Sequence, residues 1–410
     1  MAYQLLEQPG EMGLARSPIF FYAYDAARWE NEGFYYIAEV YVWSGDVVDD
    51  KPAVPTIRLS RYPDATHGAA FDVSDICNTH LDEHEVREAG ALFTHGVVWC
   101  AVEFGYVDTA TGEHLNELAS SPLAVTKGWS KPMEGVNFDP TLDTTTGKNR
   151  WLTDRSTRIR IYDGCYFTLA LPFESYSYGV YKVKIWDDNG GSVLYDLHGT
   201  LIGTADNSNE RVLAFQCGYN TWLTDPTNLN AKVAFSSLLN PLREYYVQGE
   251  NNAGSAVTKK FTFEIAPYKV WDFYTIQFLN RYGVWDYLIC EGRRNDKLEI
   301  DSAEVFRNPL LIDISGVNIR AGRGQYTQEV MAREGFTLNT GWLQEQDNEL
   351  VRQLLLSKRV VCGESPDGGK TYLPLTVKMN TWDEMTQRGD KLINYELSFR
   401  HAFDYINTIK

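Results

Sequence analysis

Short runs in which apolar and polar residues alternate recur along most of the chain, with turn-forming residues between them. The clearest run covers residues 392–400, where polar residues alternate with four apolar ones: Ile393, Tyr395, Leu397 and Phe399. Alternation with a period of two is typical of a strand with one buried face and one wet face. A second case is the pair of runs 181–186 and 192–197, which flank Asp-Asp-Asn-Gly-Gly and predict a hairpin. The pattern therefore predicts a mainly β protein.

One segment has the period of an amphipathic helix instead. In residues 342–356, Leu343, Leu350 and Leu354 fall on one helical face, and acidic residues and glutamines occupy the other. Thr340 stands where an N-cap would be expected. Predicted strands follow this helix, so the C-terminal part reads as a sheet that carries one helix.

Turn-rich polar stretches divide the predicted strands into three groups. We expect an N-terminal β-sandwich over residues 1–125, a middle β domain with long polar loops over 126–258, and a sheet-plus-helix module over 259–410. The fold class expected is thus mainly β, with tandem β-sandwich-like units followed by a C-terminal β-sheet module that carries one amphipathic helix. The polar segments 127–154 and 218–259 are expected to be insertions that reach neighbouring molecules.

Composition narrows the classes of partner. A net charge of −17 repels phosphate backbones, so we expect no nucleic-acid binding. No apolar run approaches membrane-spanning length, and residues 1–10 lack the basic and apolar regions of a signal peptide. The six cysteines are scattered singly without a CxxC motif, which indicates buried free thiols made in a reducing cytoplasm.

The C-terminal third resembles a known family. After the amphipathic helix come Val-Val-Cys-Gly-Glu at 360–364, Tyr-Leu-Pro-Leu-Thr-Val at 372–377 and Asn-Tyr-Glu-Leu-Ser-Phe-Arg-His-Ala-Phe at 394–403. Upstream, residues 273–289 place an Asn-Arg-x-Gly turn between two aromatic strands. This arrangement, over residues 261–404, resembles the distal-tail, hub and minor tail proteins of tailed bacteriophages, whose modules carry a sheet flanked by a helix and assemble into rings.

The resemblance implies a structural role rather than an enzymatic one. It implies a virion protein, assembled in the cytoplasm of the host bacterium, that forms a homo-oligomeric ring, hub or adaptor in the tail or baseplate. Its partners would be further copies of itself, other tail proteins and fibres. The scaffold would consist of the segments 342–356, 273–279 and 392–403.

The sharpest chemical motif is His80-Leu-Asp-Glu-His84, which matches H-x-x-E-H. If the segment is helical, both histidines lie on one face and can hold zinc beside Glu83 as a base. An acidic exposed helix between two strands is the competing interpretation, and short motifs of this kind match easily by chance. Asp187-Asp-Asn-Gly-Gly191 offers oxygen ligands to calcium but fits a hairpin turn better. We therefore expect no catalytic residue, metal or cofactor.

Tryptophans in polar segments support a second hypothesis. Trp129, Trp151 and Trp222 lie in polar stretches, where an exposed indole suggests contact with a neighbouring subunit or a glycan. The alternative function is therefore a carbohydrate- or receptor-binding β protein of the virion. Packing in the core or in a subunit interface is the competing interpretation for all three rings.

Overall fold

The computed structural model describes most of the chain. It covers residues 3–45, 47, 49–81, 92–94, 97–109, 111–143, 148–149, 151–162, 167–172, 182–187, 192–196, 212–218, 244–251, 253–266, 273–307, 324–364, 371–379, 381–387, 393–403 and 405–407. Two compact units are formed: Met1–Lys269 with Phe278–Tyr287 and Glu349–Ser357, and Val270–Gln277 with Leu288–Asn348 and Lys358–Lys410. The protein is mainly β, with several sheets, as the alternating pattern predicts.

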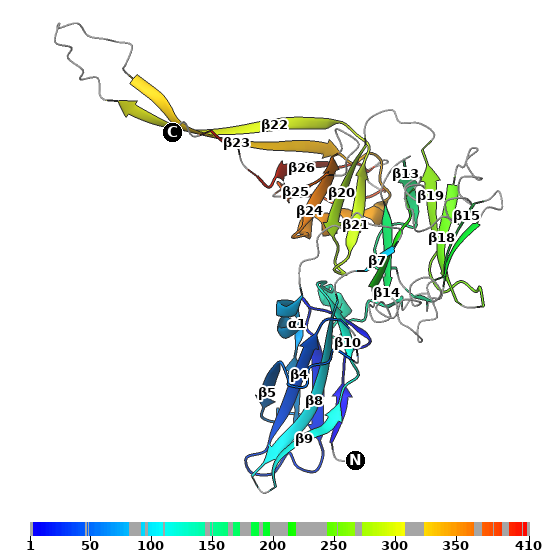
Figure 1. Ribbon diagram of the computed structural model, residues 1–410, viewed down its shortest axis with the longest axis vertical. Helices are drawn as coiled ribbons and strands as arrows, with labels where there is room; N and C mark the ends of the chain where they lie inside the picture. The colour runs from blue at the N-terminus through cyan, green and yellow to red at the C-terminus, as the bar shows by residue number, and fades with distance from the viewer. Residues whose placement is uncertain are drawn as a thin grey trace, which may run out of the picture. The chain divides into compact units, whose positions relative to one another are not determined.

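The N-terminal part of the first unit is a pair of sheets around one core (Figure 1). One sheet has the strand order β1-β3-β6, and the other has the order β2-β10-β8-β4-β5, with β9 beside β8. The strands are β1 (Tyr3–Glu7), β2 (Met12–Leu14), β3 (Phe20–Asp25), β4 (Tyr35–Trp43), β5 (Ile57–Arg61), β6 (Gly68–Asp72), β8 (Val98–Asp108), β9 (Gly112–Ala119) and β10 (Leu123–Thr126). The central strands β4 and β8 are buried over most of their length, whereas the outer strand β5 is mostly exposed.

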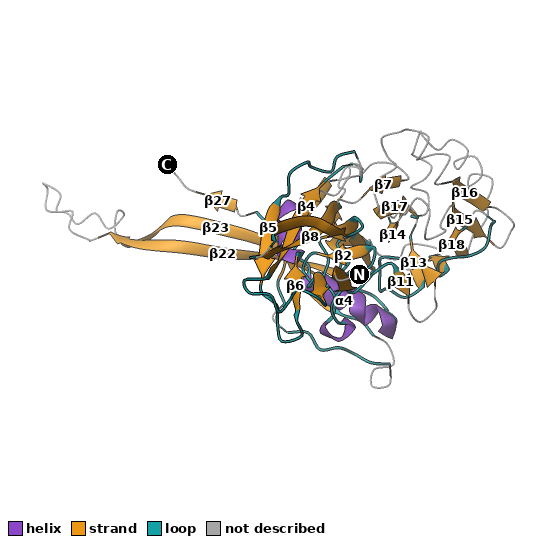
Figure 2. Ribbon diagram, turned by 90° about the horizontal axis from the view of Figure 1, so that it is seen from below, coloured by secondary structure: helices purple, strands orange, loops and turns teal. Residues whose placement is uncertain are grey.

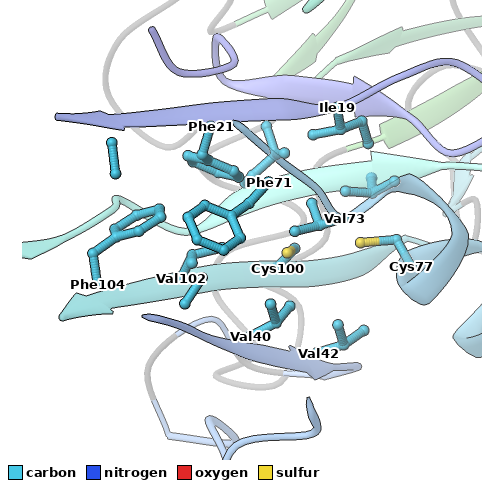
Figure 3. Packing of buried hydrophobic residues seen from close by; sticks show 14 of the residues in the cluster. Ile19, Phe21, Val40, Val42, Phe71, Val73, Cys77, Cys100, Val102 and Phe104 are labelled. Atoms are coloured by element: carbon cyan, nitrogen blue, oxygen red, sulfur yellow. The ribbon is translucent and has the colours of Figure 1, made fainter. Parts of the chain in front are cut away.

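Aromatic rings and a cysteine pair fill this core (Figure 3). The ring of Phe104 lies 5.7 Å from that of Phe21 and 6.1 Å from that of Phe71, measured between centroids. Figure 3 also shows the sulfur of Cys77, from helix α1 (Ser74–His80), directed towards Cys100. A hydrogen bond from Cys77 and burial together raise the pKa of the Cys100 thiol. The five described cysteines are buried and form no disulfide, and Cys165 lies outside the described residues.

A second pair of sheets follows in the same unit. One has the order β13-β19-β18-β15-β16 and the other has the order β14-β17-β7. The strands are β7 (Leu92–Thr94), β13 (Arg158–Ile161), β14 (Thr168–Pro172), β15 (Lys182–Asp187), β16 (Ser192–Asp196), β17 (Val212–Gln216), β18 (Glu244–Glu250) and β19 (Phe261–Ile265), and a separate small ladder joins β11 (Leu142–Asp143) to β12 (Lys148–Asn149). The hairpin predicted around residues 187–191 is confirmed by the antiparallel pairing of β15 with β16. Strand β7 precedes residue 125 in sequence but pairs with β17.

Strand β18 corrects the prediction that residues 218–259 form a polar insertion. It pairs with both β15 and β19, so it lies inside its sheet. Its residues alternate between half-buried and buried, with Tyr245 and Val247 in the core. The polar residues around it conceal this short alternation in the sequence.

The C-terminal sheet has eight strands in the order β21-β20-β24-β25-β26-β23-β22, with β27 beside β23. They are β20 (Tyr274–Leu279), β21 (Trp285–Cys290), β22 (Arg294–Arg307), β23 (Gly324–Asn339), β24 (Val360–Glu364), β25 (Thr371–Val377), β26 (Glu396–His401) and β27 (Tyr405–Asn407). The four apolar residues of the run 392–400 are all buried, as predicted. Strand β22 is an outer strand of this sheet.

The predicted helix exists, but it begins later than expected. Helix α4 covers Asn348–Leu356 and follows a single 3-10 turn, Glu345–Asp347, which Gln344 and Asp347 cap. Thr340 is not the cap, because its hydroxyl accepts the backbone N–H of Tyr395 and its own N–H donates to the Tyr395 carbonyl. These bonds to Tyr395, the residue before β26, hold residue 340 at the end of β23.

Candidate functional site

The β22–β23 hairpin carries the most conspicuous unpartnered surface of the second unit. The strands contain 14 and 16 residues and pair along their whole length (Figure 2). On the other side of β23, β26 pairs only with residues 335–339 and β27 only with residues 330–332. Within the described residues, no strand pairs with the outer edge of β22. We call this hairpin the arm.

The two faces of the arm differ in chemistry. Leu298 and Ile300 lie on one face, opposite Glu334 and Ala332, and Val330 follows two residues beyond Ala332. The side chains of Lys297, Glu299 and Asp301 point to the other face, because successive residues of a strand alternate. There Arg333 forms an ion pair with Asp301 at 3.5 Å. The arm is thus amphipathic, like a strand that covers a core.

No core covers the apolar face of the arm within the described residues. Leu298 is 56% exposed and Ile300 is 60% exposed. Burying one such side chain contributes about 1.5–3 kcal/mol. Beyond the residues that pair with β26 and β27, the arm is a two-stranded ribbon, which is only marginally stable alone in water. Both facts favour an arm that gains stability from contact with another surface.

The base of the arm is firmly anchored. Phe336 and Leu338, on the same face as Leu298, are buried. The guanidinium of Arg294 lies 4.4 Å from the centroid of the Phe336 ring and forms an ion pair with Asp296 at 2.6 Å. The arm therefore starts from a buried, well-packed part of the sheet. Sequence reasoning missed it, although the alternation Lys-Leu-Glu-Ile-Asp at 297–301 was a usable signal.

A buried ionic cluster is the main polar feature of the first unit. The side chain of Arg281 is 3% exposed, donates to both carboxylate oxygens of Glu134 at 2.7–2.8 Å and forms an ion pair with Asp154. Asp154 also accepts hydrogen bonds from the Tyr282 hydroxyl at 2.6 Å and from the Gln353 amide at 2.8 Å. The cluster joins four separate places in the sequence, at residues 134, 154, 281–282 and 353.

The electrostatics of this cluster suit a structural role. Burial by itself would raise the pKa of Asp154, but the charge of Arg281 and the hydrogen bonds from Arg281 and Tyr282 outweigh burial and lower it. Burial would lower the pKa of Arg281, but Tyr282 and Asp154 outweigh burial and raise it. Both groups are therefore charged at neutral pH and act as a fixed ion pair rather than as an acid and a base.

Helix α1 ends at the first residue of the H-x-x-E-H motif. Its last residue is His80, and Leu81 has an extended backbone, so the helix assumed for the motif does not continue past His80. The Nδ1 atom of His80 lies 2.9 Å from the carbonyl oxygen of Ile76. Glu83 and His84 lie outside the described residues. Among the residues that the structure describes, no group of three or more His, Cys, Asp or Glu side chains is arranged to hold a metal ion.

The three predicted contact tryptophans have different positions. Trp151 is 2% exposed, and its indole N–H donates to the carbonyl oxygen of Lys259 at 2.9 Å. At position 151, this burial favours packing in the core over an exposed ring that contacts a glycan or a neighbouring subunit. Trp129 is half-buried, and its backbone N–H donates to the carbonyl oxygen of Arg281. Trp222 lies outside the described residues.

Substituting Trp151 by phenylalanine tests its structural role. The change keeps an aromatic ring in the core but leaves the Lys259 carbonyl without its indole donor, which is expected to lower the free energy of unfolding by about 1–3 kcal/mol. Chemical unfolding of the variant and of the parent chain measures the difference. Equal stability of the two would show that the buried hydrogen bond contributes nothing.

Comparison with known proteins does not identify a family. No family model and no curated protein matches this chain. Among solved structures, a trypsin-activated alpha-2-macroglobulin from Escherichia coli matches at 8% identity and a TM-score of 0.22, over 83% of this chain and 19% of that one. The chain thus spans about a fifth of the length of that structure. A TM-score this low does not indicate a shared fold. Within the described residues, no helix is long and apolar enough to span a membrane.

Proposed function

We propose that this chain is a non-enzymatic structural subunit of a tailed-bacteriophage virion, which uses its arm to dock onto a neighbouring subunit in a ring, hub or adaptor of the tail. The resemblance of residues 261–404 to tail proteins supports the virion context. The arm supports the assembly role, and it is the observation on which the proposal depends. Docked copies of one chain, related by rotation, give a closed ring when the rotation closes.

The exposed apolar face of the arm gives the subunit a physical reason to dock. A subunit that remained alone would keep Leu298 and Ile300 in water near the base of a long ribbon whose outer part has only two strands. Contiguous exposed apolar surface of this kind is typical of protein interaction sites. In an assembly, the same side chains are buried and the arm is held on both sides.

Imaging and native mass measurement of the purified full chain over a concentration series test the proposal. We expect assemblies of fixed copy number, and antibodies against the chain should label the tails of virus particles from the same source. A chain that stays monomeric at every concentration and is absent from purified particles would contradict the proposal.

The double substitution Leu298→Ser and Ile300→Ser tests the role of the arm. Both side chains are more than half exposed, so the free energy of unfolding should change by less than about 1 kcal/mol. Assembly should weaken about tenfold or more, because two apolar anchors are lost. Leu356→Ser is the matched control, since Leu356 is 58% exposed but lies outside the arm. Equal assembly of the double variant and the control would exclude the arm.

A further inference from the structure

A second open sheet edge lies in the first unit, at β5. This strand is the last in the order β2-β10-β8-β4-β5, so only β4 pairs with it among the described residues. Ile57 is 41% exposed, while Leu59 is half-buried and packs against the core of the sandwich. Arg58 and Arg61 are exposed. The strand is thus a basic edge on a strongly acidic protein.

From these two edges we infer that strand β22 of one copy pairs antiparallel with strand β5 of a second copy. The inference rests on the proposed function and names the partner of the arm: another copy of this chain. Addition of a strand to an open sheet edge is a common mode of recognition, in which main-chain hydrogen bonds supply affinity and side chains set the register.

One antiparallel register matches every residue of β5 with a complementary residue of the arm. Because the strands run in opposite directions, the residue numbers rise along β5 while they fall along β22. The five pairs would be Ile57 with Ile300, Arg58 with Glu299, Leu59 with Leu298, Ser60 with Lys297, and Arg61 with Asp296. Apolar residues thus oppose apolar ones, and both arginines oppose acids. Opposite charges and apolar pairs across strands each contribute about 0.2–1 kcal/mol.

The same register also brings the correct faces together. Ile57 and Leu59 stand opposite Val40 and Ala38 of β4, which belong to the core of the sandwich. Residues directly opposite each other in a ladder share a face of the sheet. Leu298 and Ile300 would therefore extend the core side of the sandwich, while Glu299 and Lys297 would face water. The exposed apolar face of the arm would be continuous with an existing core.

Neighbouring registers lack this match. A shift of one residue places Arg58 opposite Leu298 or Ile300 and moves the charged face of the arm to the core side. A shift of two residues in one direction places Arg58 opposite Lys297 and Leu59 opposite Asp296. A shift of two residues in the other direction keeps Arg58 opposite an acid, Asp301, but places Arg61 opposite Leu298. Antiparallel pairing of two β22 strands centred on residue 299 would place Glu299 against its own copy, although Lys297 would then face Asp301. Of these pairings, the proposed register with β5 is the one that gives both arginines an acidic partner and opposes no like charges.

This contact is heterologous, because the arm of one copy meets the β5 edge of the next. Every copy in a closed ring would use both of its edges, so a fixed copy number results without a second kind of contact. Two copies that exchange arms would satisfy the same pairing.

Charge reversal on the purified full chain, measured by analytical ultracentrifugation, tests the inference. Arg58→Glu and Glu299→Arg should each weaken self-association about tenfold or more, because each places like charges opposite one another. The double variant should recover to within a few-fold of the parent chain. An equimolar mixture of the two single variants should also associate, since each supplies the edge that matches the other's arm. Glu396→Arg is the matched control, because it reverses an exposed charge outside the arm, on β26, which lies between β25 and β23.

Thermal unfolding of each variant accompanies these measurements, because Arg58 also forms an ion pair with Glu113 of its own chain. The inference is overturned if the two single variants associate as the parent does, or if the double variant and the mixture both fail to recover. In that event, loss of assembly in the Leu298→Ser and Ile300→Ser variant would leave the proposed function standing with a different surface under the arm. A parent chain that never associates and is absent from virions would overturn both.

Discussion

Replacing Arg281 by methionine is expected to lower the free energy of unfolding of the first unit by about 3–5 kcal/mol. Removing one partner of a buried ion pair has this effect because the remaining charges stay in a poorly solvated site without compensation. Here both Glu134 and Asp154 lose the guanidinium that lies between them. Urea unfolding followed by tryptophan fluorescence measures the change.

Two comparisons make the Arg281 result specific. Arg61→Met removes an exposed arginine of β5 and should change stability by no more than about 0.5 kcal/mol. Arg281→Lys keeps the charge but loses the planar fork that contacts both carboxylates, so its stability should fall between that of the parent and that of Arg281→Met. If the lysine and methionine variants were equally unstable, geometry rather than charge would dominate the cluster.

The same cluster predicts a loss of stability in acid. The pKa of Asp154 in the folded chain is lower than its ordinary value of 3.8. The unfolded state therefore binds a proton more readily, and the contribution of this group is fully present above pH 3.8 and is lost as the pH falls through the lowered folded pKa. Stability measured between pH 6 and pH 3 should fall less in Arg281→Met than in the parent.

Replacing Phe104 by alanine is the second large effect, an expected loss of about 3–5 kcal/mol in the first unit. The side chain is fully buried and packs against the rings of Phe21 and Phe71, so the substitution removes apolar contacts and leaves a cavity (Figure 3). Phe403→Ala provides the matched control, because that ring is 39% exposed and its loss should cost about 1 kcal/mol or less. Unfolding midpoints in urea give both numbers, and a loss below about 1 kcal/mol for Phe104→Ala would mean that the core closes over the gap.

The local hydrophobic pattern was sufficient to predict elements in which buried residues recur with the period of a strand or a helix. The alternation at Ile393, Tyr395, Leu397 and Phe399 predicted four buried residues, and all four are buried. The hairpin around residues 187–191 and the existence of helix α4 were predicted on the same basis. Such features depend on residues close together in the chain, whose side chains alternate or recur whatever the rest of the molecule does.

Contacts between residues far apart in the sequence determined the positions of side chains that the local pattern did not predict. Thr340 is a good cap by residue type, yet its partner is Tyr395, which lies 55 positions away. Trp151 has polar neighbours in the sequence, but its buried indole N–H donates to the carbonyl oxygen of Lys259, 108 positions away. Likewise, the acids around Arg281 lie 127 and 147 positions from it. Contacts at such separations leave no local period in the sequence.

For the arm and the β5 edge too, some features follow from the sequence and others only from the tertiary structure. The sequence by itself determined a mainly β, acidic chain with alternating strands, because side-chain periodicity and charge are local properties. It also contained the amphipathic run 297–301, but such a run is equally typical of a strand that covers a core. Only the tertiary structure decided that β22 and β5 are outer strands and that Leu298 and Ile300 remain exposed, because the identity of an edge depends on which strands are absent beside it.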